Sequence, residues 1–117
     1  MMATPYFIEN DFAKAEPLML RAVKIDQTLY GPDGAEALPN LTVLCSIYDK
    51  LAKPEKAAPC QGHLLAILEK QYGPDNPIIV PTLTGEATAL RSLGRNEEAA
   101  KIEQRIKTIQ ATAMNQN

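Results

Sequence analysis

Few residues in this chain belong to the types that most often carry out catalysis or bind metals. His63 is the one histidine, and Cys45 and Cys60 are the two cysteines. Cys60 and His63 stand three positions apart, a spacing that could pair a thiol with an imidazole on one helix face. A nucleophilic pair of this kind also needs a third group to orient the imidazole, and the apolar pattern turns Cys60 toward the core. No histidine or cysteine follows His63 at i+3 or i+4, as a helical metal site would require.

The two cysteines also lack the spacing of a metal or redox motif. They lie in separate apolar segments without a Cys-x-x-Cys pattern. We therefore expect small buried thiols, with a disulfide or a reactive thiol as the alternatives. Residues 73–75, Gly-Pro-Asp, lack the further glycines and the lysine of a phosphate-binding loop. The sequence therefore predicts a protein that is not an enzyme and that has no metal or other cofactor.

Charge and composition argue against two further classes of partner. The chain has a net charge of −2 and scattered basic residues, whereas a nucleic-acid-binding surface needs clustered lysine and arginine. No apolar run approaches the ~20 residues of a membrane-spanning helix. Residues 1–8 lack the basic start and the apolar core of a secretory signal. We therefore expect a soluble cytoplasmic protein that binds neither nucleic acid nor membranes, and its status as a fragment of a longer chain stays open.

An internal repeat is the main signal in the sequence. Residues 29–33, Leu-Tyr-Gly-Pro-Asp, are followed 42 positions later by Gln-Tyr-Gly-Pro-Asp at residues 71–75. The same offset relates Ile25 to Ile67 and Ile67 to Ile109. Gly-Pro-Asp alone is ordinary turn chemistry, but matches spread along a chain at one fixed offset indicate a duplicated unit.

Each unit is expected to fold as two helices. Ala, Leu, Glu, Lys and Gln are abundant and favour helix, and apolar residues at i, i+3, i+4 and i+7 form a buried stripe in each segment. A Gly-Pro pair then stops the second helix of a unit. We predict helices over residues 11–30, 35–52, 54–72, 77–93 and 96–112, with a frayed segment 1–10 and a loose polar tail 113–117. Four prolines fall early inside these helices and should loosen or bend their first turns: Pro17, Pro39, Pro59 and Pro81.

These residues resemble the tetratricopeptide repeat, in the 42-residue variety found in kinesin light chains. The second helix of that family opens with aromatic-x-x-Ala-Glu-x-Leu, and residues 12–18 read Phe-Ala-Lys-Ala-Glu-Pro-Leu. Armadillo and HEAT repeats share the approximate period but not this opening. The resemblance implies an all-α fold, an α-solenoid of antiparallel helix pairs with about two and a half repeats. The single domain would then comprise a partial repeat 1–33, repeats 34–75 and 76–112, and the tail, with residues 4–10 as the end of an incomplete first helix.

The resemblance also implies a partner and a surface for it. In such arrays the first helix of each pair lines an inner surface that binds a protein or peptide, and kinesin light chains carry paired asparagines there. The matching positions hold Thr42 and Val43, then Thr84 and Gly85, so this peptide-gripping role is not carried over. The candidate partner-binding residues of the inner surface are Asn40, Val43, Ser46, Ile47, Lys50, Thr82, Gly85, Thr88 and Arg91.

The first predicted helix is more apolar than its counterparts. Met19 and Leu20 correspond to Gln61 and Gly62 at the repeat offset, and the ends of a repeat array need polar outer faces. We therefore predict an exposed hydrophobic association face. Upstream repeats, a second copy of the chain or another partner would cover it. Its candidate residues are Phe12, Met19, Leu20 and Val23.

Two functions follow as alternatives. The leading interpretation is a non-catalytic protein–protein interaction or scaffold module that binds a peptide or protein on its inner surface. The alternative is a structural segment, either self-associating or acting as a spacer in a longer array, with no dedicated ligand. Dependence of binding on Asn40 and Lys50 favours the first, and dependence of assembly on Met19 and Leu20 favours the second.

Overall fold

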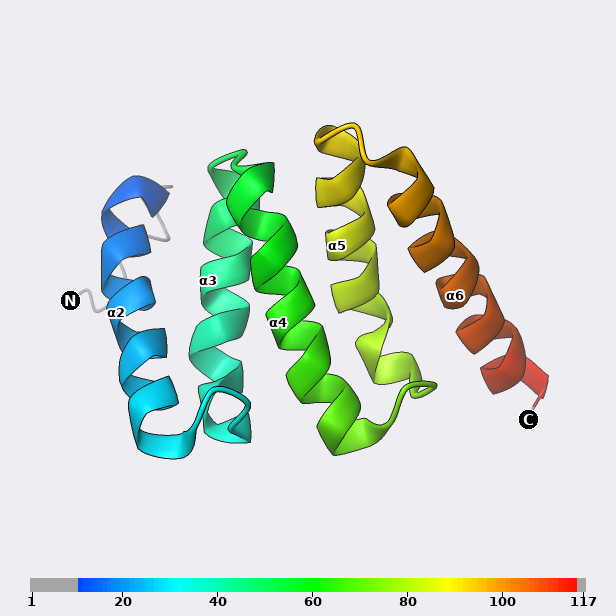
Figure 1. Ribbon diagram of the computed structural model, residues 1–117, viewed down its shortest axis with the longest axis horizontal. Coiled ribbons are helices and arrows are strands. Elements are labelled where there is room, and N and C mark those ends of the chain that lie inside the picture. Colours follow the sequence, from blue (N-terminus) through cyan, green and yellow to red (C-terminus); the bar gives the residue numbers. More distant parts are fainter. Residues whose placement is uncertain (1–10, 116–117) are drawn as a thin grey trace.

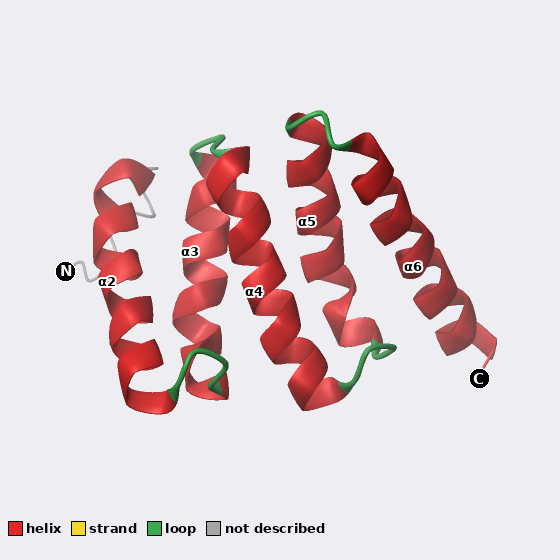
Figure 2. Cartoon of the chain, viewed as in Figure 1, coloured by secondary structure: helices red, strands yellow, loops and turns green. Residues whose placement is uncertain are grey.

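The computed structural model describes residues 11–115, and all of their regular structure is helical. Five α-helices pack antiparallel in chain order, so that each contacts the next along a single row (Figures 1 and 2). The all-α prediction is therefore confirmed. The elements are α2 (Phe12–Tyr30), η1 (Ala35–Ala37), α3 (Leu38–Lys50), α4 (Pro54–Tyr72), η2 (Pro77–Ile79), α5 (Val80–Ser92) and α6 (Asn96–Asn115). The predicted lead-in 1–10, with its helix end at 4–10, lies outside the described residues.

The bounds of these elements recur at the sequence offset. α2 and α4 begin at residues 12 and 54 and end at residues 30 and 72. α3 and α5 begin at residues 38 and 80 and end at residues 50 and 92. Each pair differs by 42 positions at both ends, as do the two short 3₁₀ turns. Residues 42 apart therefore adopt the same secondary structure.

Two glycines end the long helices by adopting a backbone conformation closed to other residues. Gly31 has φ 90° and ψ 163°, and Gly73 has φ 89° and ψ 165°. This region is essentially restricted to glycine. Each glycine N–H donates to a carbonyl four residues back, on Gln27 and Glu69. The chain then turns sharply toward the start of the next helix.

The four repeated prolines fall into two classes, which corrects part of the prediction. Pro17 and Pro59 lie inside α2 and α4, as expected. Pro39 and Pro81 are the second residues of α3 and α5, because a short 3₁₀ turn comes first. The first turn of a helix has no partner for its N–H groups, so proline is tolerated there without disturbing the helix.

The last helix is longer than predicted. α6 runs to Asn115, so residues 113–115 are helical and do not belong to a loose tail. Residues 111–114, Ala-Thr-Ala-Met, contain no glycine or proline, and alanine and methionine favour helix.

A continuous apolar core runs through all five helices. One cluster extends from Val23 in α2 to Ala99 in α6, and a second joins Leu83 in α5 to Ile109 in α6. Leu68 and Ile102 pack against both clusters. Each helix thus buries one face against its neighbours, which supplies most of the stabilisation of such short helices.

Polar tethers between successive long helices also recur at the offset. His63 Nε2 donates to the Pro32 carbonyl (2.6 Å), and His63 Nδ1 accepts from Gln27 Nε2 (3.4 Å). The residues 42 positions later repeat this arrangement. Arg105 pairs with Glu69 and donates to the Pro74 carbonyl (2.9 Å). His63 and Arg105 therefore hold the Gly-Pro turn against the next long helix.

Candidate partner-binding groove

A groove of about 230 Å³ lies between α3 and α5, with α4 as its floor. It is the place where the structure brings together residues of the predicted inner surface, because Ser46, Thr82 and Gly85 all line it. The remaining lining residues are Thr42, Cys45, Asp49, Gln61, Leu64 and Pro81. The walls are therefore uncharged except for one carboxylate.

A glutamine on the floor gives this groove its polar centre. Gln61 is 6% exposed, and its Nε2 donates to Asp49 Oδ2 at 3.3 Å. The amide occupies space left by the missing side chain of Gly85, because a Cβ built there would lie 2.7 Å from Gln61 Nε2. Glycine at position 85 thus leaves room for the Gln61 amide, and any larger residue would displace that amide.

The surroundings of Asp49 act on its pKa in opposite directions. Burial raises its pKa, and the hydrogen bond from Gln61 acts in the opposite direction. At the repeat offset these two residues correspond to Arg91 and Glu103, which form a two-bond ion pair (2.8 and 2.5 Å). In each helix pair, a polar side-chain contact therefore joins the first helix to the second. Only the contact between α3 and α4 uses an amide.

Sequence reasoning missed both Gln61 and Asp49. Gln61 lies on α4, the second helix of its pair, and the interpretation of an inner surface considered only first helices. Gln61 reaches the groove because α4 forms its floor. The one available signal was glycine at position 85, where the related helix carries Val43.

The other predicted inner-surface residues divide into several environments. Ile47 is 1% exposed, so its assignment to a binding surface is wrong, because the residue belongs to the packed interior. Thr82 lines the groove but is only 7% exposed. Asn40 turns toward α2, where its Nδ2 donates to Asp26 (2.9 Å). Half-buried Val43 lies outside the groove lining, as do exposed Lys50, Thr88 and Arg91.

The predicted hydrophobic face of α2 is corrected in its residues. Val23 is 3% exposed and belongs to the core, and Met19 and Leu20 pack against that core. The exposed large hydrophobic residues of α2 are Leu18, Ile25, Leu29 and Tyr30, at 53%, 52%, 66% and 50%. The prediction assigned the wrong face of α2 to the surface, because Met19, Leu20 and Val23 lie on the face that packs against α3 and α4. Phe12 is half-buried.

No family model matches this chain, and a search of curated proteins found no significant match. The assignment to a tetratricopeptide-like family therefore stays a proposal that rests on the residues of the chain.

The two cysteines lie inside the helical core. Cys45 and Cys60 are buried free thiols, as expected. The hydrogen-bonded Cys60 thiol, together with burial, raises the pKa of Cys45.

Among residues 11–115, no three histidine, cysteine or acidic side chains gather closely enough to hold a metal ion. Over the same span, none of the helices has both the length and the apolar character needed to cross a membrane.

Proposed function

We propose that this chain is a tetratricopeptide-like solenoid module that binds an extended peptide or protein segment in the groove between α3 and α5. Its function is to hold a partner, without catalysis. The observation that carries the proposal is the Gln61 amide, which is held in place by Asp49 and Gly85 at the floor of the groove.

A fixed side-chain amide suits an extended peptide because it carries the same groups as a peptide bond. The single hydrogen bond of Gln61 uses one N–H, and within residues 11–115 its Oε1 has no partner. One acceptor and one further donor therefore remain for a backbone N–H and C=O. Because burial and the hydrogen bond to Asp49 already restrict Gln61, little side-chain entropy would be lost on binding.

The periodicity of the chain supports the helical-repeat part of the proposal. Element bounds, glycine turns and the tethers of His63 and Arg105 all recur 42 positions apart. An array of this kind creates a surface from equivalent helices of successive units. α3 and α5 are such equivalents, and the groove lies between them.

The test begins with selection of binding peptides from a random library on the whole chain. The affinity of a selected peptide is then measured for the native sequence and for Gln61→Met, which preserves volume but removes the amide. We expect the dissociation constant to rise at least about tenfold, because a hydrogen bond worth about 1.5 kcal/mol is lost. Thr108→Ala on α6 is the matched control and should bind as the native chain does. Equal affinity for Gln61→Met, with its helical content intact, would exclude the groove.

Exposed apolar residues on α2 favour a second candidate function, self-association of the chain. Leu18, Ile25 and Leu29 are each more than half exposed. They recur at i, i+7 and i+11, so they share one helix face. Their burial against a second copy would contribute about 25 cal/mol per Å². Sedimentation should show a concentrated native chain as a dimer and Ile25→Glu as a monomer, with Lys14→Glu as the control. A monomeric native chain would leave peptide binding as the only candidate.

A further inference from the structure

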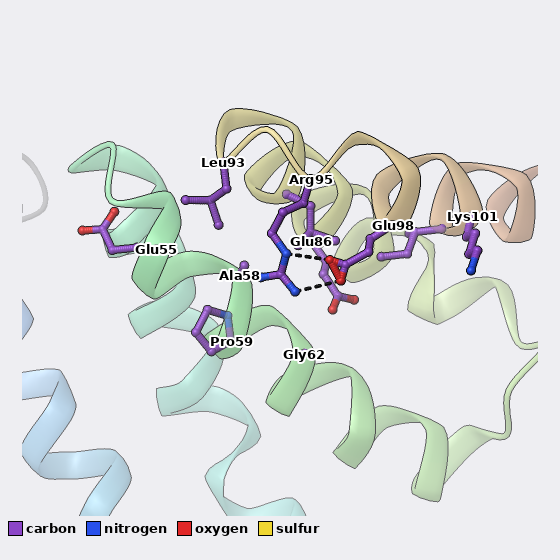
Figure 3. A pocket seen from close by; sticks show the side chains of 11 residues that line it. Glu55, Ala58, Pro59, Gly62, Glu86, Leu93, Arg95, Glu98 and Lys101 are labelled. Carbon is purple, nitrogen blue, oxygen red and sulfur yellow. Dashed lines mark hydrogen bonds and ion pairs between the residues drawn. The ribbon is translucent and has the colours of Figure 1, made fainter.

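A second groove, separate from the one between α3 and α5, lies between α4 and α6. Its volume is about 540 Å³, and α5 forms its floor. Apolar side chains of Ala58, Leu90 and Ile102 line it, together with charged residues at its rim. Figure 3 shows the carboxylate of Glu86 in this groove, near the ion pair of Arg95 and Glu98.

Glu86 departs from the pattern that the repeat imposes. At the offset of 42 its counterpart is Leu44, which is 3% exposed and belongs to the core. The residue across the groove, Gly62, corresponds to Leu20, which also packs against the core. The matching groove between α2 and α4 thus has a leucine at each of these two positions. In the groove between α4 and α6, one leucine is replaced by a carboxylate and the other by a glycine.

The two replacements fit each other in space. A Cβ built on Gly62 would lie 3.3 Å from Glu86 Oε2, so glycine leaves just enough room for the carboxylate. Within residues 11–115 Glu86 forms no hydrogen bond and no ion pair. Arg95, whose side chain is drawn beside Glu86 in Figure 3, is already paired with Glu98 at 2.5 and 2.7 Å.

An unpaired, half-buried carboxylate is costly to the folded chain. Burial raises the pKa of Glu86, Arg105 lowers it, and the carboxylates of Glu69 and Glu98 raise it further. A leucine or a neutral residue at position 86 would avoid this penalty. A local departure from the folding pattern without an internal compensation is typical of a functional position.

We infer that the groove between α4 and α6 binds a basic side chain, lysine or arginine, of a partner protein. The ammonium or guanidinium group pairs with the Glu86 carboxylate. The hydrocarbon stem lies against Ala58, Leu90 and Ile102, since long basic side chains pack their methylenes on apolar surfaces. Charge complementarity selects a basic partner, because the groove lining carries three carboxylates, on Glu55, Glu86 and Glu98, against two cations, on Arg95 and Lys101.

The probe for the test is Nα-acetyl-lysine methylamide, and its matched control is Nα-acetyl-norleucine methylamide, which lacks only the ammonium group. Both are titrated into the isotopically labelled whole chain at constant ionic strength, and backbone amide signals are followed by NMR. We expect saturable shifts at Gly62 and Glu86 with the lysine probe alone, with a dissociation constant of about 1–10 mM, as expected for a charge-assisted hydrogen bond together with the burial of the methylenes.

Variants then locate the interaction. Glu86→Gln should weaken binding of the lysine probe at least about tenfold, as expected for loss of a charge-assisted hydrogen bond. Glu97→Gln, which removes a charge of α6 outside the groove lining, should bind normally. Gly62→Ala places a methyl group against the carboxylate, so it should weaken binding while thermal stability is preserved, because alanine favours helix.

Three results would overturn the inference. The first is absence of saturable shifts at Gly62 and Glu86. The second is equal binding of the norleucine probe, which would show apolar contact alone. The third is unchanged binding in Glu86→Gln. None of these outcomes bears on peptide binding between α3 and α5, which depends on Gln61 and on a different face of α4.

Discussion

At the scale of single residues, Glu16 connects helices that are far apart in the sequence. Its side chain is 13% exposed and pairs with Lys53 at 2.7 Å and Lys56 at 3.3 Å. Hydrogen bonding to Lys53 lowers the pKa of Glu16, burial opposes this effect, and Lys56 lowers the pKa further. The ionised carboxylate thus holds the start of α2 against the start of α4.

The lowered pKa of Glu16 predicts a pH-dependent contribution to stability. The folded state holds this proton more weakly than the unfolded state, so the contribution is complete above about pH 4.5 and is lost as the pH falls through the folded pKa. At neutral pH, Glu16→Gln should lower the free energy of unfolding by about 1 kcal/mol. Urea unfolding of both proteins between neutral and acidic pH measures the difference. A difference that grows toward low pH would contradict this assignment.

Cys45 illustrates how packing suppresses the chemistry of a reactive residue type. Cys45 is 2% exposed and Cys60 is 8% exposed, and the pKa of Cys45 is raised by the Cys60 thiol and by burial. Because the thiolate is the reactive form, iodoacetamide at neutral pH should label the native chain at least about tenfold more slowly than the urea-unfolded chain. Mass spectrometry at intervals provides the rates. Rapid labelling of the native chain would place a thiol at the surface.

At the scale of elements, the helix ends carry the strongest local constraint. Gly73 ends α4 at φ 89° and ψ 165°, where a side chain is strained. Gly73→Ala should therefore lower the free energy of unfolding by about 1–3 kcal/mol. Gln71→Ala, in the last turn of the same helix, should change it by less than about 0.5 kcal/mol. Thermal unfolding followed by circular dichroism compares the two variants, and equal midpoints would show that the turn relaxes without cost.

At the scale of the whole molecule, the shared core predicts cooperative unfolding. Ile67 is fully buried, and Leu68 and Ile102 contact both apolar clusters. Ile67→Ala should lower the free energy of unfolding by about 2–5 kcal/mol, and α2 and α6 should lose structure in one transition. Amide exchange in urea reports both helices separately. The control is Ile78→Ala, since Ile78 is 48% exposed and its loss should cost less than about 1 kcal/mol. Separate transitions for α2 and α6 would show that the clusters are independent.

Helix positions and turns could be predicted from the sequence because their causes are local. Apolar spacing, glycine at the ends of long helices and the fixed offset determine where each helix begins and ends within a few residues. The extra length of α6 and the early 3₁₀ turns were missed, since nothing in the sequence marks them sharply. Secondary structure of this kind depends on neighbours three or four residues away.

The faces of the helices were decided only by tertiary structure. Ile47 and Val23 are apolar residues on helices with more than one apolar side, and packing by neighbouring helices selected which side is buried. Gln61 meets Gly85, and Gly62 meets Glu86, only because α4 and α5 lie against each other at one particular register. The sequence alone determined a duplicated set of helices. The contacts between those helices created both grooves, because a groove is formed by side chains from segments that the sequence separates.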